Sequence, residues 1–147
     1  MANTNDPDGF TPAYHMSGGT IRPQEFAIAS ATNASIFSGD VVNLSSGLVI
    51  QGTATGTPLG VFYGVEYTAT SGEIIFAKMW TADVATLGSA NAKALVYVDP
   101  DIVYEAQGSA TPTQASIGTT NTITTTAGDS ATGRSKEAVT ATTSSGI

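Results

Sequence analysis

Residues 59–67, Leu-Gly-Val-Phe-Tyr-Gly-Val-Glu-Tyr, form the stretch of sequence that decides the fold. β-Branched and aromatic side chains dominate this run, and such a composition is typical of a strand that packs on a core. Gly60 and Gly64 interrupt the run, and a glycine inside a strand often marks a bulge or a close approach of another backbone. The stretch therefore predicts a long strand with an irregular middle.

Similar short runs lie on both sides of this stretch at a spacing of roughly ten residues, separated by Gly, Ser, Asp and Pro. The expected strands are residues 26–30, 35–37, 41–44, 48–50, 73–80, 93–98 and 101–106. We expect 73–80 to be one continuous strand, and 93–98 to form a hairpin with 101–106 across the turn Asp99-Pro100-Asp101. Seven or eight short strands and no good amphipathic helix predict an all-β fold, a small β-barrel or β-sandwich.

The chain divides by composition into three units. Residues 1–22 are rich in turn formers, and the irregular spacing of Phe10 and Tyr14 predicts an extended N-terminal arm rather than a helix or a regular strand. Residues 23–107 hold the β pattern of the core. Residues 108–147 are dominated by Thr, Ser, Ala and Gly and contain too few large aliphatic side chains for an independent domain. High strand propensity predicts that this last unit adds strands to the core or to a neighbouring chain.

Charge and cysteine content exclude several classes of protein. The 147 residues carry a net charge of -7, only 12% of them are charged, and 5 are Lys or Arg. So few cations cannot neutralise a row of phosphates, so we expect no nucleic-acid partner and no binding to an anionic membrane. The absence of cysteine removes disulfide scaffolds and thiol chemistry. No apolar run approaches the roughly 18 residues of a membrane span, and the first ten residues lack the pattern of a secretory signal.

The low charge itself admits two interpretations. Charged residues normally cover about a quarter of a globular domain and discourage self-association. A chain so poor in lysine also leaves its strand edges with little protection against pairing. The protein is therefore either an ordinary threonine-rich β domain or a subunit whose neutral surface is covered by its neighbours.

Residues suited to catalysis are scarce. His15 is the only histidine and lies in the expected arm, whereas catalytic groups are normally held on rigid elements. The glycine-rich segment 52–56 lacks the following lysine of a phosphate-binding loop. Asp99 and Asp101 offer oxygen atoms to Ca²⁺, but the same residues are ordinary turn formers. We therefore expect no enzyme, no metal site and no cofactor.

Three segments carry a family resemblance: Ile36–Val42 (IFSGDVV), Thr57–Phe62 (TPLGVF) and Val96–Asp101 (VYVDPD), the last followed by a threonine-rich run. Together they resemble small capsid decoration, or cement, proteins of tailed bacteriophages. The resemblance implies a compact barrel of β-tulip type, often trimeric, or a jelly roll that dimerises. It also implies a place on the outer capsid surface of the virion, where the protein clamps adjacent major capsid subunits. The family pattern leads us to expect a final apolar strand, and residues 108–147 show a low-complexity stretch instead.

The expected partners are thus the major capsid protein and further copies of the chain, as a trimer or a dimer. We expect the N-terminal arm to dock on the capsid through Asp6, Phe10, Tyr14 and His15, so that deletion of residues 1–20 abolishes particle binding and leaves the fold intact. The alternative is a β domain of a virion or cell-surface fibre that binds carbohydrate or a host surface through exposed Tyr and Trp side chains. A small hydrolase is the least favoured possibility because acid–base machinery is missing.

Overall fold

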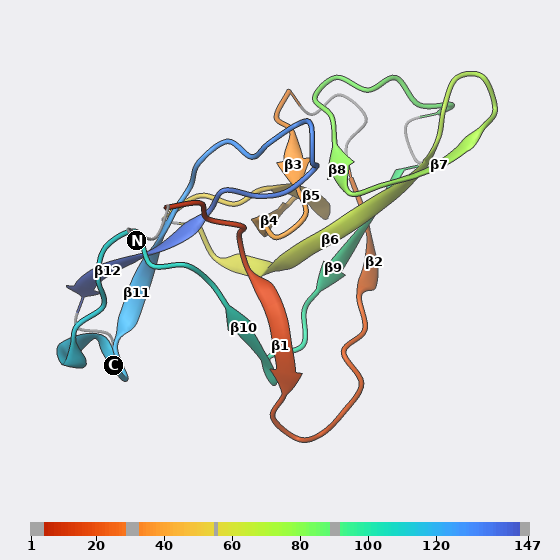
Figure 1. Ribbon diagram of the computed structural model, residues 1–147. Coiled ribbons are helices and arrows are strands. Elements are labelled where there is room, and N and C mark those ends of the chain that lie inside the picture. Colours follow the sequence, from red (N-terminus) through yellow and green to blue (C-terminus); the bar gives the residue numbers. More distant parts are fainter. Residues whose placement is uncertain (1–4, 29–32, 55, 89–91, 145–147) are drawn as a thin grey trace.

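The chain folds into an all-β domain, as the sequence predicts, in a computed structural model that describes residues 5–28, 33–54, 56–88 and 92–144 (Figure 1). The strands are β1 (Thr11–His15), β2 (Gln24–Ala27), β3 (Ile36–Phe37), β4 (Val41–Ser45), β5 (Leu48–Gln51), β6 (Pro58–Thr68), β7 (Ile74–Ala77), β8 (Met79–Trp80), β9 (Ala92–Tyr97), β10 (Ile102–Glu105), β11 (Thr120–Thr124) and β12 (Ala138–Ser144). A single turn of 3₁₀ helix, η1 (Gln114–Ser116), precedes β11.

The main sheet has six antiparallel strands, and β6 is its centre. The strand order is β2-β9-β6-β4-β5, and β7 also pairs with β6. At 11 residues, β6 is long enough for β4 to pair with its first half while β7 pairs with its second half. The outer strands β2 and β5 meet at a parallel bridge between Ile28 and Val49. The sheet therefore curls round on itself without forming a continuous closed barrel.

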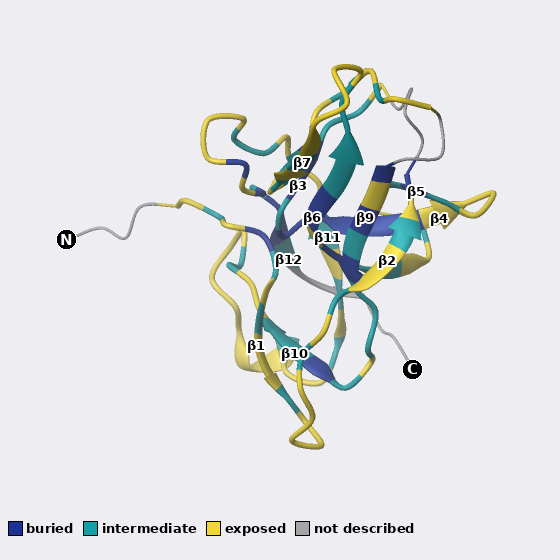
Figure 2. Ribbon diagram, turned by 90° about the vertical axis from the view of Figure 1, so that its right-hand side faces the viewer, coloured by how far each residue is buried: buried dark blue, intermediate teal, exposed yellow. Residues whose placement is uncertain are grey.

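The hydrophobic core fills the inside of this curl, where Figure 2 shows the buried parts of β4, β6 and β9. The short pair β3–β8 covers it and contributes Ile36 and Trp80, which lie opposite each other in register. Trp80 has no solvent exposure and meets the ring of Tyr67 edge-on, with ring centroids 5.5 Å apart. The remaining fully buried core residues are Ile28, Val42, Val49, Phe62, Val65, Ala92, Ala94 and Val96.

Two details of the expected strand pattern are wrong. Residues 73–80 are not one strand, because the chain leaves β6 after Ala77 and pairs again with β3, which buries Trp80 in the core. The hairpin of 93–98 with 101–106 does not form either. Both edges of β9 are already taken by β2 and β6, so β10 pairs with β1 instead.

Strands β1 and β10 form a two-stranded ribbon that projects from the main sheet in both views (Figures 1 and 2). Residues 11–15 are thus a strand, contrary to the prediction of an arm without regular strand structure. The register shifts between Pro12 and Tyr14, a bulge that accommodates a proline without a backbone N–H. Backbone pairing with β10 makes these residues a strand, although the irregular spacing of Phe10 and Tyr14 does not predict one.

The C-terminal unit makes its own strand pair and then returns to the sheet. β11, within the threonine-rich run, pairs with β12. Between these strands, the chain passes beside the β3–β4 turn, where the Ser38 N–H donates to the Gly133 carbonyl at 3.0 Å and the Ser135 N–H donates to the Ser38 carbonyl at 2.9 Å. Residues 133–135, which lie between these two strands, therefore contact the β3–β4 turn of the core.

Candidate functional site

A bulge in β6 turns one aromatic side chain out of the sheet. The pairing of β6 with β9 shifts between Phe62 and Gly64, so Tyr63 is an additional residue in β6. Phe62 points into the core, whereas Tyr63 is 50% exposed. A Cβ atom on Gly64 would lie 2.9 Å from the Ala77 carbonyl oxygen, so the glycine permits the close approach of β7. The glycines in the stretch 59–67 were the signal for this bulge.

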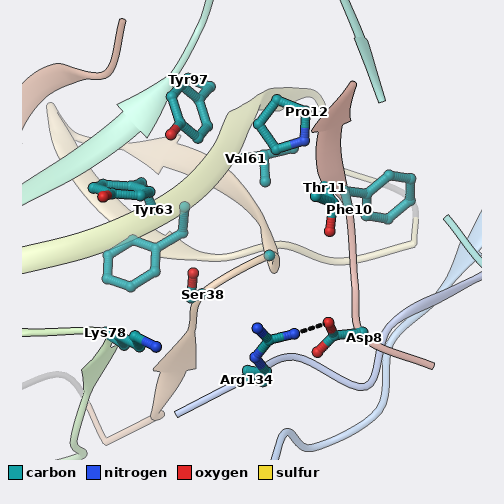
Figure 3. Close-up of a pocket in the computed structure, with 12 residues that line it drawn as sticks. Asp8, Phe10, Thr11, Pro12, Ser38, Val61, Tyr63, Lys78, Tyr97 and Arg134 are labelled. Atoms are coloured by element: carbon teal, nitrogen blue, oxygen red, sulfur yellow. Dashed lines mark hydrogen bonds and ion pairs between the residues drawn. The ribbon is translucent and has the colours of Figure 1, made fainter. Parts of the chain in front are cut away.

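Tyr63 borders an open hollow of about 420 Å³ (Figure 3). Its ring centroid lies 5.4 Å from that of Tyr97, and the two rings are inclined at 57°. Burial, and then the nearby Tyr63, raises the pKa of Tyr97. The two tyrosines form one wall of the hollow, and residues 10–12 form the wall opposite. The volume lies within the range of small-ligand sites, about 300–1,000 Å³.

Polar groups line the floor of the hollow. Arg134 forms an ion pair with Asp8, and both side chains are about half exposed. An ion pair in that setting contributes less than about 1 kcal/mol to stability. Its main effect is to hold the Arg134 and Asp8 side chains in place at the hollow. Lys78 and Ser38 lie on the same side of the hollow (Figure 3). The site thus combines two phenol rings with an ammonium group, a guanidinium group and a carboxylate.

A second hollow of about 290 Å³ adjoins the first and shares Ser38, Tyr63 and Lys78 with it. Its other side is apolar and includes Phe76 and Leu95. Phe76 is 70% exposed, and Ile74, two residues earlier on the same face of β7, is 62% exposed. We call Tyr63, Ile74, Phe76 and Leu95 the outer-face patch. The sequence does not predict this patch, because no local signal distinguishes the exposed Phe76 from the buried Trp80.

The N-terminal wall is fixed by backbone contacts with the β3–β4 turn. The Phe10 N–H donates to the Gly39 carbonyl at 2.9 Å. Gly9, with φ of +70°, lies so close to Ser135 that an added Cβ would be 2.5 Å from the serine Cβ. Residues 8–10, the turn 37–40 and the segment 133–137 therefore meet at one place, which we call the junction.

His15 is enclosed by hydrogen bonds. Its Nε2 lies 3.0 Å from the Asp99 carboxylate, and its Nδ1 accepts from the backbone N–H groups of Ser17 and Gly19, at 3.3 Å each. Because an amide N–H can only donate, Nδ1 carries no proton and Nε2 donates to Asp99. The other Asp99 oxygen accepts the Asp101 N–H at 2.9 Å, and this bond first, then His15, lowers the pKa of Asp99.

His15, Asp99 and Asp101 are the residues near the ribbon that could ligate a metal ion. The three residues offer donor atoms within 4.8 Å of one another. Both ring nitrogens and both Asp99 oxygens are already engaged in hydrogen bonds. The arrangement matches a structural link that ties the projecting ribbon to the Asp99 turn.

The four residues expected to bind the capsid do not form one cluster. Phe10 lines the first hollow. Asp6 lines a third, polar hollow of about 460 Å³ that shares Asp8 and Arg134 with the first. Tyr14 lies on the ribbon and is 59% exposed, while His15 is held by Asp99.

The expectation of an exposed tryptophan for carbohydrate binding is wrong, because Trp80, the only tryptophan, lies in the core. Exposed tyrosines do occur, at Tyr14 and Tyr63.

Comparison with known proteins identifies no family: no protein-family model, no curated protein and no solved structure matches the chain. In the part of the chain that the structure describes, no helix has the length and apolar character needed to cross a bilayer. Arguments about function therefore depend on the sites themselves.

Proposed function

We propose that this protein is a structural capsid decoration protein that binds the outside of a phage head and clamps adjacent major capsid subunits. The observation that carries the proposal is the outer-face patch. Large apolar side chains exposed together on one sheet face mark an interaction surface more often than a solvated one. Aromatic residues of this kind supply most of the binding energy in protein interfaces.

The projecting ribbon supports a second contact. Among the described residues, strands β1 and β10 pair only with each other, so each has an outer edge at which a further strand could be added. Strand addition provides affinity through main-chain hydrogen bonds. Tyr14 on β1 would supply a side-chain anchor beside that edge. In this proposal, the ribbon and the outer-face patch contact different parts of the shell.

The charge of the chain fits this placement. A net charge of -7 favours the outer surface of the head over the DNA-filled interior. Only 12% of residues are charged, which permits contacts between identical copies, as a trimer or a dimer. Many weak contacts act together on a shell, because linked binding raises the effective concentration at each site.

The proposal includes no catalytic activity. His15, the only histidine, has both ring nitrogens engaged in hydrogen bonds that fix the ribbon. A general base needs a nitrogen free to accept a proton from a bound substrate. Its environment thus supports a structural role.

The test is cosedimentation of the full chain with purified phage heads that lack it. Phe76→Ser should weaken binding by about tenfold or more, since buried aromatic anchors cost that much on removal. Ile117→Ser is the matched control, because Ile117 is 73% exposed and lies outside both hollows. Failure of the unaltered chain to bind heads would reject the proposal, and equal binding by the Phe76 variant would reject the patch as the contact.

One observation favours the alternative, a β domain that binds carbohydrate. The first hollow presents the inclined tyrosine pair beside Lys78 and Arg134, and such sites join aromatic walls to a few polar groups. Calorimetric titration with host polysaccharides tests it, with Tyr97→Ala compared with Phe76→Ala. Tyr97 lines only the first of the two hollows and Phe76 only the second, so carbohydrate binding should be lost in the Tyr97 variant alone.

A further inference from the structure

Two acidic side chains lie inside the protein, away from the hollows described above. Asp40 follows the turn between β3 and β4, and Glu137 lies immediately before β12. Both residues have no solvent exposure. They are 97 positions apart in the sequence and meet at the junction, where the C-terminal unit returns to the sheet. Fully buried carboxyl groups are rare unless they are paired or hydrogen-bonded.

Each carboxyl group uses one oxygen to accept a backbone hydrogen bond. Asp40 Oδ2 accepts the Phe37 N–H at 2.8 Å, and Glu137 Oε2 accepts the Val41 N–H at 2.8 Å. Ser135 connects the two groups: its hydroxyl bonds to the Asp40 carboxyl, and its Oγ accepts the Glu137 N–H at 3.0 Å. The second oxygens, Asp40 Oδ1 and Glu137 Oε1, are buried and have no partner among the described residues.

The surrounding charges do not neutralise this pair. Within the described chain, the charged groups on the segments packed here are Asp6, Asp8, Lys78, Asp129, Arg134 and Lys136. Arg134 pairs with Asp8 at the surface, and Lys136 acts on Asp129. Burial, and then the charge of Asp40, raises the pKa of Glu137 to about 7 although the Val41 N–H lowers it, and burial also raises the pKa of Asp40. Two adjacent carboxylates in such a place cannot both ionise without a large cost.

We propose that Asp40 and Glu137 share one proton, and that this proton locks the segment of residues 128–139 onto the sheet. The shared proton leaves the pair with a single negative charge. The two acceptor bonds from the Phe37 and Val41 N–H groups stabilise that charge. This proton-dependent closure is a property of the fold and does not depend on the proposed function.

Release of the proton to solvent should open the segment. In the closed form Glu137 keeps its proton up to about pH 7, whereas an exposed Glu loses it near its ordinary value of 4.5. Opening is therefore coupled to loss of one proton between these two pH values. The opening equilibrium constant should rise about tenfold per pH unit over that interval and level off above about pH 7.

Hydrogen exchange on the full-length protein between pH 4.5 and 8 tests this lock. The amides of Ser135 and Val139 report on the segment, since they donate to the Ser38 and Gln107 carbonyls, and Val96 in β9 reports on the core. We expect the protection factors of the segment amides to fall by roughly two orders of magnitude as pH rises, with little change at Val96. A segment profile that is flat with pH, or a parallel fall at Val96, would overturn the proposal.

Two neutral variants and one control sharpen the result. Glu137→Gln replaces the group that titrates with an amide, so segment protection should become nearly independent of pH and exceed that of the unaltered chain at pH 8. Asp40→Asn removes the neighbouring charge but leaves Glu137 buried, so it should only reduce the pH dependence. Glu105→Gln, on the exposed edge of β10, should leave the profile unchanged. If a variant fails to fold, the pH profile of the unaltered chain still decides. Tighter closure on addition of Ca²⁺ at pH 8, reversed by a chelator, would show a cation between the oxygens and overturn the shared proton.

Discussion

The core and the junction are both buried, but different interactions hold them. Inside the curled sheet, the fully buried side chains are apolar, with Phe62 and Trp80 the largest. At the junction, the buried side chains include Asp40, Ser135 and Glu137. The core is stabilised by the removal of apolar surface from water, which does not depend on pH. The junction is stabilised by hydrogen bonds that depend on a proton.

This difference indicates which part of the protein can change conformation without global unfolding. Loss of the junction bonds would free residues 128–139 while the main sheet keeps its curl round the core. The outer-face patch lies on the opposite side of β6 from Phe62, so surface contacts and core packing occupy the two faces of one strand. Variants that separate these regions test the comparison directly.

The largest effect is expected in the core. Phe62→Ala should lower the free energy of unfolding by about 3–5 kcal/mol, because it leaves a cavity in a fully buried site. Phe76→Ala is the matched control on the exposed face and should change it by less than about 0.5 kcal/mol. Urea denaturation followed by the fluorescence of Trp80 measures both. Similar losses in the two variants would contradict the assignment of inner and outer faces.

The next prediction distinguishes the junction from the core by the pH dependence of the free energy of unfolding. Because the pKa of Glu137 is about 7 in the folded chain and 4.5 ordinarily, its contribution is complete below pH 4.5 and lost as pH rises to about 7. The loss should reach up to about 3 kcal/mol. Comparing urea unfolding of the unaltered chain and of Glu137→Gln at pH 4.5 and pH 8 measures it. Equal pH dependence of the two chains would show that Glu137 is not the group responsible.

A smaller effect tests the packing of the junction. Gly9→Ala should cost about 2 kcal/mol, since the left-handed backbone costs about 1 kcal/mol and the added methyl group crowds Ser135. Gly18→Ala is the matched control: its φ is +75°, but nothing lies within 4 Å of the added Cβ. In thermal unfolding, the Gly9→Ala variant should therefore have a lower melting temperature than the Gly18→Ala variant. The same loss in both would mean that backbone conformation alone sets the cost.

The smallest effect on the fold concerns the ribbon. His15→Ala removes the bonds to Asp99, Ser17 and Gly19 and should lower stability by about 1 kcal/mol. Hydrogen exchange should increase in β1 and β10 and stay unchanged in β9. Unchanged hydrogen exchange in β1 and β10 would contradict the structural role of His15.

Local patterns in the sequence were enough to predict most strands of the main sheet, although β7 ends at Ala77 and not at residue 80. Residues 29–30 of the expected strand 26–30 lie outside the described residues. The run 59–67 forms β6, and its glycines mark the bulge that exposes Tyr63. Strand partners were harder to predict, because pairing depends on which edges are free in the folded chain. The expected hairpin failed for this reason, since β2 and β6 flank β9.

The candidate site was less predictable than the fold. Phe76 and Trp80 are both aromatic residues in the range 73–80, yet one is exposed and the other fully buried. The break between β7 and β8 places them on different sides, and no local signal marks that break. The junction was also missed, because Asp40 and Glu137 look like surface residues until the fold brings them together.

Deletion of residues 1–20 is a poor test of capsid binding, because these residues include part of the folded structure. Such a deletion removes β1 from β10 and Gly9 and Phe10 from the junction, so it disturbs the fold as well as the surface. The double variant Tyr63→Ser/Phe76→Ser changes exposed side chains only.

The central claim is that the outer-face patch fastens this protein to a viral shell. Quantitative mass spectrometry of gradient-purified phage particles measures it, as copies of this chain per major capsid subunit. The unaltered chain should occur in a fixed whole-number ratio to that subunit, and the Tyr63→Ser/Phe76→Ser chain should be lost from the particles although it folds normally. Absence of the unaltered chain from intact particles, or full occupancy by the double variant, would contradict the account.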